Sequence, residues 1–367
     1  MRAAANDRRV VNLAGGLPSD AQFPRQELAA AFVRVVSHDG GRALQYGWAE
    51  GAERLRGFVA ERLRARGAAI DADDVIVTAG AQQGIAIALE LTTRTGRRDR
   101  VGVGDESYPA ALDLMRARGL APVAALTGVR VRYVMPAIDN PRGRAMVDEV
   151  RRALLATRAA IIEDDAYADL AFDGPAPRPL LADAPDRVLH VGTLSKTLCP
   201  GLRIGWLVVP RRLRSRALRL KQSADLQASS LGQAVAETYL LGEGHTPPVD
   251  FDARLVRLRR FYRRRAAMLA RALRAELPGW RFTPPAGGFA FWVEAPPGAP
   301  PVDELAWLRA ALDAGVMFDP GSSFRPDGAT GSTAARLCFS SAPVDAFAVG
   351  VRRFARAWRR CAPRRDV

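Results

Sequence analysis

The sequence predicts an α/β fold in which helices cover both faces of a mostly parallel sheet, followed by a smaller C-terminal α/β domain. Short apolar runs alternate with amphipathic segments along residues 73–240, which is typical of parallel strands joined by helices. The 367 residues are enough to enclose two cores. Gly, His and two prolines interrupt the pattern at 242–250. We therefore expect an N-terminal arm and part of the small domain at 1–45, a large domain at 46–242 and the small domain at 243–367.

Strands are expected where short, apolar and often β-branched runs lie between turn signals. The first, at 73–78, runs directly into a glycine-containing turn and an apolar helix. The other strands expected in the large domain are 100–104, 121–126, 129–135, 159–163, 188–191 and 204–209. Those expected in the small domain are 287–293, 316–318 and 335–339.

Helices are expected where apolar residues recur with helical spacing. Gly40 and Gly41 are expected to break the chain after the first of them, and Asp303 to act as an N-cap. The expected helices are 26–37, 53–66, 85–91, 109–118, 146–156, 211–221, 229–240, 252–277, 304–314 and 344–359.

The charge of the chain raises the question of nucleic acid. The net charge is +15, and arginines cluster at 211–221 and 254–274. Leucine and other apolar residues are interleaved with them, as in amphipathic helices with one solvated basic side. No helix-turn-helix, RRM or zinc-finger pattern accompanies these segments. A compositional bias toward arginine is therefore favoured over a specific nucleic-acid partner.

Residue usage also bears on location and on metal chemistry. The sequence has no uncharged apolar run of about 18 residues and no apolar export signal at its start, so no membrane partner is expected. Its three cysteines, Cys199, Cys338 and Cys361, have no metal-ligand spacing and suit a reducing cytoplasm. With only three histidines, a zinc site or a Ser-His-Asp triad is disfavoured, and no metal is expected.

Lysine is nearly absent from the chain. Only Lys196 and Lys221 occur among 54 basic residues. Arginine stays protonated, whereas a lysine with a lowered pKa can attack a carbonyl or carry a proton. Lys196 follows a strand-like run and lies among small, hydroxylated residues in the stretch GTLSKTLCPGLRIGW at 192–206. This setting favours an amine that binds an aldehyde, although a surface lysine in a loop has the same local pattern.

Other reactive side chains follow the expected strands. Ligands of parallel sheets bind beyond the carboxyl ends of the strands, where these side chains should meet. A helix start after the first strand offers backbone N–H groups to a phosphate. An aromatic ring, an amide, carboxylates, a phenol, an amine and an arginine follow other strands. The residues are Gly80, Ala81, Gln82, Tyr108, Asn140, Glu163, Asp164, Asp165, Tyr167, Ser195, Lys196 and Arg203. These are the groups that a pyridoxal phosphate site requires.

Ten motifs in order along the chain resemble those of the fold-type I, class I/II aminotransferases. Each is weak alone, but together they are specific for the fold and its cofactor, pyridoxal 5′-phosphate. In these motifs the chain is most similar to 2-aminoadipate/kynurenine-type aminotransferases and to the aminotransferase-like domain of MocR regulators. The motifs are AGGLPSDAQFP (14–24), LQYGWAEG (44–51), TAGAQQG (78–84), SYP (107–109), DNPRG (139–143), EDDAY (163–167), the stretch at 192–206, PAGGFAFWV (285–293), PGSSF (320–324) and RLCFS (336–340).

The resemblance implies roles around the cofactor ring. Lys196 resembles the lysine that binds the cofactor aldehyde and shuttles protons, and Asp164 the carboxylate partner of the pyridine nitrogen. Tyr167 and Asn140 resemble the contacts to the ring's 3′ oxygen. Tyr108 resembles the aromatic ring that stacks on the cofactor. Lys196, Asp164 and Tyr108 are thus the expected catalytic residues.

The resemblance also implies phosphate and substrate contacts. Arg336 resembles the arginine that binds the substrate α-carboxylate, with Gly16 and Asn140 beside it. Tyr46 resembles a tyrosine that reaches the phosphate of a neighbouring subunit, which implies a homodimer with shared active sites. The expected phosphate contacts are Ala81, Gln82, Ser195 and Arg203.

Several residues near these motifs are expected to have structural roles or depart from the family pattern. Trp48 and Trp206 are expected to pack, Cys199 to be a buried, inert thiol, and Glu163 and Asp165 to support the site. Relatives usually carry about one more helix between Ala125 and Val129. The other departures are Arg142 after the Asn-Pro pair, Ala81 without a hydroxyl, and Cys338 in place of a frequent asparagine.

The sequence thus predicts an aminotransferase that moves an amino group between an L-amino acid and a 2-oxo acid by a ping-pong mechanism. Two alternatives use the same residues. A MocR-type sensor domain would bind the cofactor without turnover, and a decarboxylase or lyase would break a different bond of the substrate. Arg336 favours retaining the carboxylate rather than expelling it. Nothing in the sequence distinguishes one amino donor from another.

Overall fold

The large sheet carries most of the predicted site. The computed structural model describes residues 7, 9–38, 40–94, 98–244, 246–300, 302–329 and 333–362. Within these, seven strands form one sheet in the order β2-β8-β7-β6-β5-β3-β4. The strands are β2 (Val75–Thr78), β3 (Arg100–Gly102), β4 (Ala121–Val123), β5 (Val131–Val134), β6 (Ala160–Asp164), β7 (Val188–Thr193) and β8 (Gly205–Val208).

The directions of these strands bring the functional loops to one edge. β3 pairs in parallel with β4 and β5, β5 with β6, and β6 with β7. β8 alone is reversed, because it is antiparallel to both β7 and β2. The carboxyl ends of the parallel strands therefore meet the amino end of β8 at the same edge.

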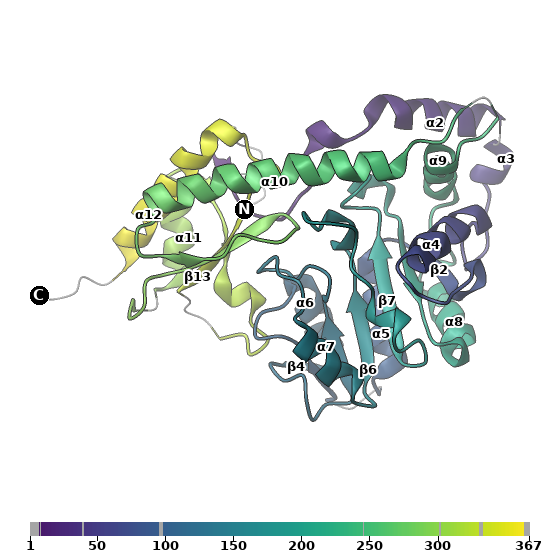
Figure 1. The fold of residues 1–367 in the computed structure, drawn as a ribbon, viewed down its shortest axis with the longest axis horizontal. Coiled ribbons are helices and arrows are strands. Elements are labelled where there is room, and N and C mark those ends of the chain that lie inside the picture. Colours follow the sequence, from purple (N-terminus) through teal and green to yellow (C-terminus); the bar gives the residue numbers. More distant parts are fainter. Residues whose placement is uncertain are drawn as a thin grey trace, which may run out of the picture.

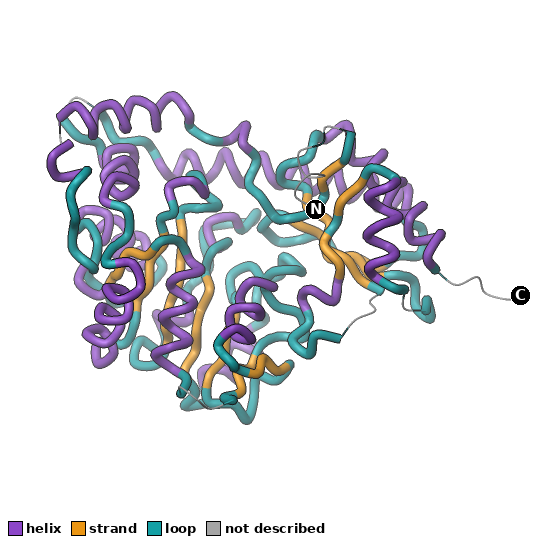
Figure 2. Tube along the Cα trace, turned by 180° about the vertical axis from the view of Figure 1, so that it is seen from behind, coloured by secondary structure: helices purple, strands orange, loops and turns teal. Residues whose placement is uncertain are grey.

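Helices lie in front of and behind the strands of this sheet (Figures 1 and 2). The prediction of a mostly parallel sheet covered on both faces is confirmed. The helices of this part are α4 (Glu53–Ala65), α5 (Ala81–Thr92), α6 (Pro109–Ala117), α7 (Asp148–Leu155), α8 (Arg214–Asp225) and α9 (Ser230–Leu241). Before them come α2 (Arg25–His38), packed against α9, and the short α3 (Gly40–Ala43). The Gly-Gly pair thus begins a helical turn, not only a break.

A smaller sheet forms the C-terminal part, in the order β12-β13-β10-β9. Its strands are β9 (Arg281–Phe282), β10 (Ala290–Glu294), β12 (Asp319–Pro320) and β13 (Ala334–Cys338). The helices of this part, α11 (Glu304–Asp313) and α12 (Phe347–Cys361), pack against each other. The N-terminal arm reaches this part, because β1 (Val11–Asn12) pairs in parallel with β11 (Val316–Met317). The domain boundaries given above stay a prediction.

The 26-residue helix α10 (Phe251–Glu276) connects the two sheets (Figure 1). It packs against α12 and also contacts the turn at Ala168–Leu170 in the large sheet's part of the chain. Its apolar face is buried as predicted, but two of its arginines are buried as well. Arg254 donates to the carbonyl oxygens of Thr197 and Gln22 (both 2.9 Å), and Arg265 to that of Phe339 (2.6 Å). None of the helices in the described ranges is both long and apolar enough to cross a membrane.

The contact between β7 and β8 requires glycine. Gly192 lies opposite Trp206 in the ladder, and a Cβ atom on it would fall 2.2 Å from the Trp206 indole. Gly205 is similarly close-packed, since its Cβ would lie 2.6 Å from the carbonyl carbon of Gly80. These two glycines let β8 and the turn before α5 approach β7 closely.

We predict that Gly192→Ala lowers the free energy of unfolding by about 1–3 kcal/mol, because Trp206 must move to admit the methyl group. Gly57→Ala is the matched control. Gly57 lies in α4 with no neighbouring atom within 4 Å, so alanine there should be neutral or stabilise by about 0.5–1 kcal/mol. Urea unfolding of both variants measures the difference, and equal midpoints would contradict the close packing.

Candidate active site

Lys196 lies at the centre of the loops that follow the strands. It comes three residues after the end of β7, and its Nζ donates to the carbonyl oxygen of Gly16 on the N-terminal arm (3.2 Å). The rings of Tyr167 and Phe289 lie 5.5 and 5.7 Å from Nζ. Burial, and next the positive charge of Arg336, lower the pKa of Lys196 to about 8. A substantial fraction of this amine is therefore neutral near physiological pH, as a nucleophile or proton carrier requires.

Asp164 ends the buried strand β6. Its Oδ2 accepts a hydrogen bond from the Tyr133 hydroxyl (2.6 Å), and its Oδ1 accepts one from the backbone N–H of Ala166 (3.1 Å). Burial raises the pKa of Asp164, while the bond from Tyr133 lowers it. Tyr133 on the neighbouring strand β5 was missed in the sequence, where it reads as one more apolar strand residue. The pair forms an oriented, buried carboxyl group at the carboxyl edge of the sheet.

The two flanking carboxylates belong to a separate buried network. Glu163 accepts from the backbone N–H groups of Leu180 (2.7 Å) and Leu181 (3.0 Å) and hydrogen-bonds Nδ1 of His190 (3.1 Å). Nε2 of His190 lies 3.7 Å from Asp165, which is also paired with Arg66. His190 lies opposite Glu163 in the β6–β7 ladder. These contacts give Glu163 and Asp165 a supporting role beneath Asp164.

The start of α5 offers hydrogen-bond donors to an anion. Its N-cap is Gly80, and no side chain among the described residues caps its first N–H groups, which come from Ala81 and Gln82. The guanidinium of Arg203 lies beside Gly80, where a Cβ atom would fall 2.5 Å from Nη2. Ser195 lies at the same edge, and its Oγ accepts from the Thr193 hydroxyl (2.9 Å). Amides and a guanidinium thus meet at the helix N-terminus, and the Ser195 hydroxyl lies at the same edge of the sheet.

Arg336, on β13, is the buried cation of the site. Its Nη1 donates to Oδ1 of Asn140 (2.8 Å). Its Nε and Nη2 both donate to Oδ2 of Asp319 (3.0 and 2.8 Å). A Cβ atom on Gly16 would lie 3.6 Å from Nη1 and from Nη2, so the arm passes close to the guanidinium. Gly16, Asn140, Tyr167 and Arg336 line one small hollow.

The aromatic residues join these groups into one cluster. Burial and next the Asp164 carboxylate raise the pKa of Tyr108 to about 12. Burial raises the pKa of Tyr167, whose ring packs edge-on against Phe289 (5.4 Å between centroids). Both phenols therefore stay protonated and can donate hydrogen bonds. The structure thus brings together every predicted site residue except Tyr46.

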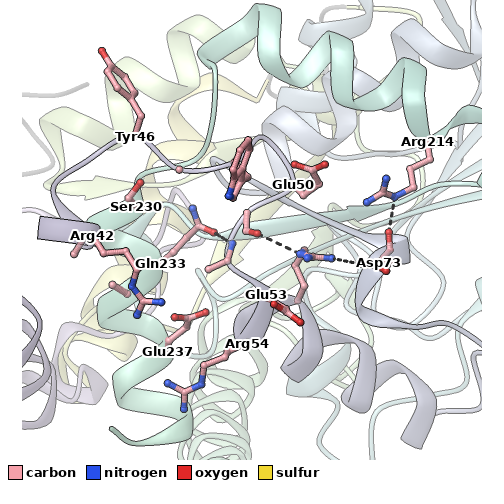
Figure 3. A pocket seen from close by; sticks show the side chains of 17 residues that line it. Arg42, Tyr46, Glu50, Glu53, Arg54, Asp73, Arg214, Ser230, Gln233 and Glu237 are labelled. Atoms are coloured by element: carbon pink, nitrogen blue, oxygen red, sulfur yellow. Dashed lines mark hydrogen bonds and ion pairs between the residues drawn. The ribbon is translucent and has the colours of Figure 1, made fainter. Parts of the chain in front are cut away.

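Tyr46 lies apart from the cluster. It borders a hollow of about 720 Å³ between the 42–56 segment and α9, and it extends away from the other residues shown in Figure 3. Its side chain is 77% exposed. Trp48, expected to pack, is 83% exposed, so that expectation is wrong. Trp206 does pack, against Gly192.

Two further residues were missed in the sequence. Arg254 binds the carbonyl oxygens of Thr197 and Leu198, so α10 holds the turn that follows Lys196. Its position within an arginine-rich helix gave no signal of this contact. Asp319 pairs with Arg336, but in the sequence it reads as part of an Asp-Pro-Gly turn.

Comparison with known proteins assigns the family. Residues 134–352 match the family model described as aminotransferase class I and II. The chain belongs to this family. It is 32% identical to 2-aminoadipate transaminase of Thermus thermophilus over 95% of this chain and 90% of that one. The regulator YjiR of Escherichia coli, of the HTH type, is 29% identical over 89% of this chain and 73% of the regulator.

A solved structure points to the cofactor of this aminotransferase. The α-aminoadipate aminotransferase of Thermus thermophilus, complexed with N-(5′-phosphopyridoxyl)-L-leucine, superimposes with a TM-score of 0.86 at 31% identity. The superposition covers 98% of this chain and 94% of that one. The present site fits pyridoxal 5′-phosphate, because an anion seat at α5, the buried carboxyl of Asp164 and the low-pKa amine of Lys196 lie at one edge. The aminotransferase uses this cofactor.

We predict that the amine of Lys196 in the cofactor-free protein reacts with acetic anhydride with a pH midpoint of about 8. Only the neutral amine reacts, so labelling should increase as pH rises through that value. Arg336→Gln should move the midpoint upward, since the arginine's positive charge lowers the Lys196 pKa. Mass spectrometry of the peptide containing Lys196 measures the labelling. A midpoint near 10.5 would contradict the enclosed environment.

Proposed function

We propose that this aminotransferase moves an amino group between an L-amino acid and a 2-oxo acid with Lys196 as its proton carrier. The observation that carries this assignment is the position of Lys196 after β7, between Asp164 of the large sheet and Arg336 of the small sheet, with its pKa lowered to about 8. A neutral amine in this position can remove a proton, and its protonated form can return one.

Pyridoxal phosphate supplies, when bound, an aldehyde that takes up amino groups and a ring that withdraws electrons from the substrate's α-carbon. Asp164 would hold a proton at the pyridine nitrogen, with its carboxyl group oriented by Tyr133. The phenol of Tyr167 and the amide of Asn140 would hydrogen-bond the 3′ oxygen. Tyr108 would supply a flat surface for the ring. The N–H groups of Ala81 and Gln82, with Ser195 and Arg203, would hold the phosphate.

Lys196 carries the proton that leaves the α-carbon of the donor. Its position at the carboxyl edge, within the electrostatic range of both Asp164 and Arg336, supports this role. Arg254 supports it indirectly, because it holds the carbonyl groups of the two residues that follow the lysine. A rigid turn limits the movements of the amine to those of its own side chain.

Arg336 binds the α-carboxylate of the substrate. Two N–H groups of one guanidinium match the two oxygens of a carboxylate. Asn140 holds one side of this guanidinium, and Gly16 leaves room beside Nη1 and Nη2. The carboxylate is thereby retained while the proton beside it is removed, which favours transamination over decarboxylation.

The active unit is a homodimer in which Tyr46 of one subunit completes the site of the other. Large apolar side chains are exposed close together in this region, which is unusual for a free surface. They are Phe32, Val33 and Val36 on α2, then Leu44, Tyr46 and Trp48. α2 and α3 pack against each other, and Leu44, Tyr46 and Trp48 follow α3 directly along the chain. An area of this kind suits a second copy of the chain.

We predict that Lys196→Arg lowers kcat by about 10³-fold, because arginine keeps the positive charge but cannot give up its proton. Lys221→Arg is the matched control, since Lys221 lies on α8, paired with Asp225. Formation of the 2-oxo acid from the best donor measures both variants. Thermal unfolding checks that each is folded. Full turnover by folded Lys196→Arg would exclude the lysine as the proton carrier.

The donor is found with a panel of amino acids that includes 2-aminoadipate and aromatic amino acids, each paired with 2-oxoglutarate. Parallel double-reciprocal plots are expected for a ping-pong exchange. The same panel tests the regulator-like alternative. A sensor domain would bind cofactor and amino acid but release no 2-oxo acid with any pair.

The shared site predicts the outcome of mixing a weakened subunit with an inactive one. Tyr46→Ala should lower activity about 10-fold through a lost phosphate hydrogen bond, and Lys196→Ala should abolish it. A hybrid of the two contains one site with both Lys196 and the partner's tyrosine, so mixing should restore about half of the activity per hybrid dimer. If Tyr46 served its own subunit, no site in the hybrid would be complete and nothing would be recovered.

A further inference from the structure

Asp319 is placed beside Arg336 by the backbone itself. The two residues lie directly opposite each other where β12 pairs antiparallel with β13. Opposed residues of a ladder have neighbouring side chains, so this pair forms whenever the sheet forms. Oδ2 of Asp319 accepts hydrogen bonds from both Nε and Nη2 of the arginine, at 3.0 and 2.8 Å. The pair is largely buried, with 8% of the arginine side chain and 22% of the aspartate side chain exposed.

These bonds leave one edge of the guanidinium for a ligand. Nε and one hydrogen of Nη2 face Asp319, and one hydrogen of Nη1 faces Asn140. The second hydrogens of Nη1 and Nη2 form a fork, beside which Gly16 passes at the distance given above. No further hydrogen-bond acceptor is found for that fork among the described residues. A substrate carboxylate can therefore bind Arg336 without displacing Asp319.

The charge of the arginine is nevertheless already balanced. A carboxylate bound at the fork would share one guanidinium with the carboxylate of Asp319, and the two anions would repel each other in a largely buried site. Asp319 is further held by the backbone N–H of Gly15, at 3.0 Å from Oδ2, so it cannot easily move away. A neutral group at the fork would meet the same hydrogen-bond donors without this repulsion.

We propose that Asp319 is a positioning residue that sets specificity: it orients the guanidinium of Arg336 and weakens its binding of a substrate carboxylate. Amino donors in which the α-carboxylate is replaced by a neutral group, such as a carboxamide, are therefore admitted beside the amino acids themselves. The inference rests on the proposed role of Arg336 in binding the substrate carboxylate. What it adds is that Asp319 opposes the binding of that carboxylate to Arg336.

The test measures binding to the cofactor-loaded full chain by calorimetry. The probes are propanoate and propanamide, which have nearly the same shape and differ in charge. Asp319→Asn should tighten propanoate binding about 10-fold, because the repulsion is removed, and leave propanamide unchanged. A general structural effect would alter the affinity for both probes. Asp327→Asn, which removes a carboxylate from an exposed pair with Arg325, is the matched control and should change neither.

A second set of variants tests whether Asp319 acts on propanoate binding by way of Arg336. Arg336→Gln should weaken propanoate binding, and adding Asp319→Asn to it should give no 10-fold gain. The specificity of turnover should change in the same direction. We compare kcat/KM for the best donor of the panel with kcat/KM for its α-carboxamide. In Asp319→Asn this ratio should rise about 10-fold in favour of the acid. Asp319→Ser serves as a second charge-removing variant if Asp319→Asn does not fold.

The outcomes separate the two proposals. If Arg336→Gln weakens propanoate binding but neither Asp319 variant strengthens it, the inference about Asp319 is wrong and the role of Arg336 stands. If Arg336→Gln leaves propanoate binding unchanged, the proposed carboxylate site is wrong, and the inference fails with it. A gain for propanoate and propanamide alike would also overturn the inference, since it would show an effect of packing and not of charge.

Discussion

The site depends on satisfying three consecutive carboxyl groups at the buried end of β6. Side chains of a strand point alternately to its two sides, so Glu163 and Asp165 share one side and Asp164 takes the other. On the shared side, His190 lies between both carboxylates. On the other side, Tyr133 alone among the described side chains donates to Asp164. Because each side has its own partners, the carboxyl group that faces the cofactor site is kept apart from the structural pair.

The part of the site that follows strand ends could be predicted from the sequence. Lys196, Asp164 and Arg203 stand next to runs that can only be buried strands, and parallel strands bring their ends to one edge. His190 and Tyr133 could not be assigned in this way, since each lies inside an apolar run and its partner depends on the order of strands in the sheet. Strand order is a long-range property that local patterns do not contain.

The longer helices and strands were predicted to within a few residues, but the two-residue strands β1, β9 and β12 were not predicted, and neither were exposure and register. Trp48 was expected to pack, yet it is exposed. Asp319 was missed because a two-residue strand leaves no periodic pattern, although its register with Arg336 places a carboxylate beside that guanidinium. Both failures concern which surface or strand a side chain meets, and tertiary packing decides this.

The arginine-rich composition is used inside the protein as well as on its surface. Arg254 and Arg265 are buried and bind backbone carbonyl groups, which a planar, permanently charged fork does well. The same permanence makes Arg336 a fixed positive charge that lowers the pKa of Lys196. A second arginine in place of that lysine would keep both charges and could release no proton. The proposed proton transfer therefore requires lysine at this position, beside an arginine that lowers its pKa.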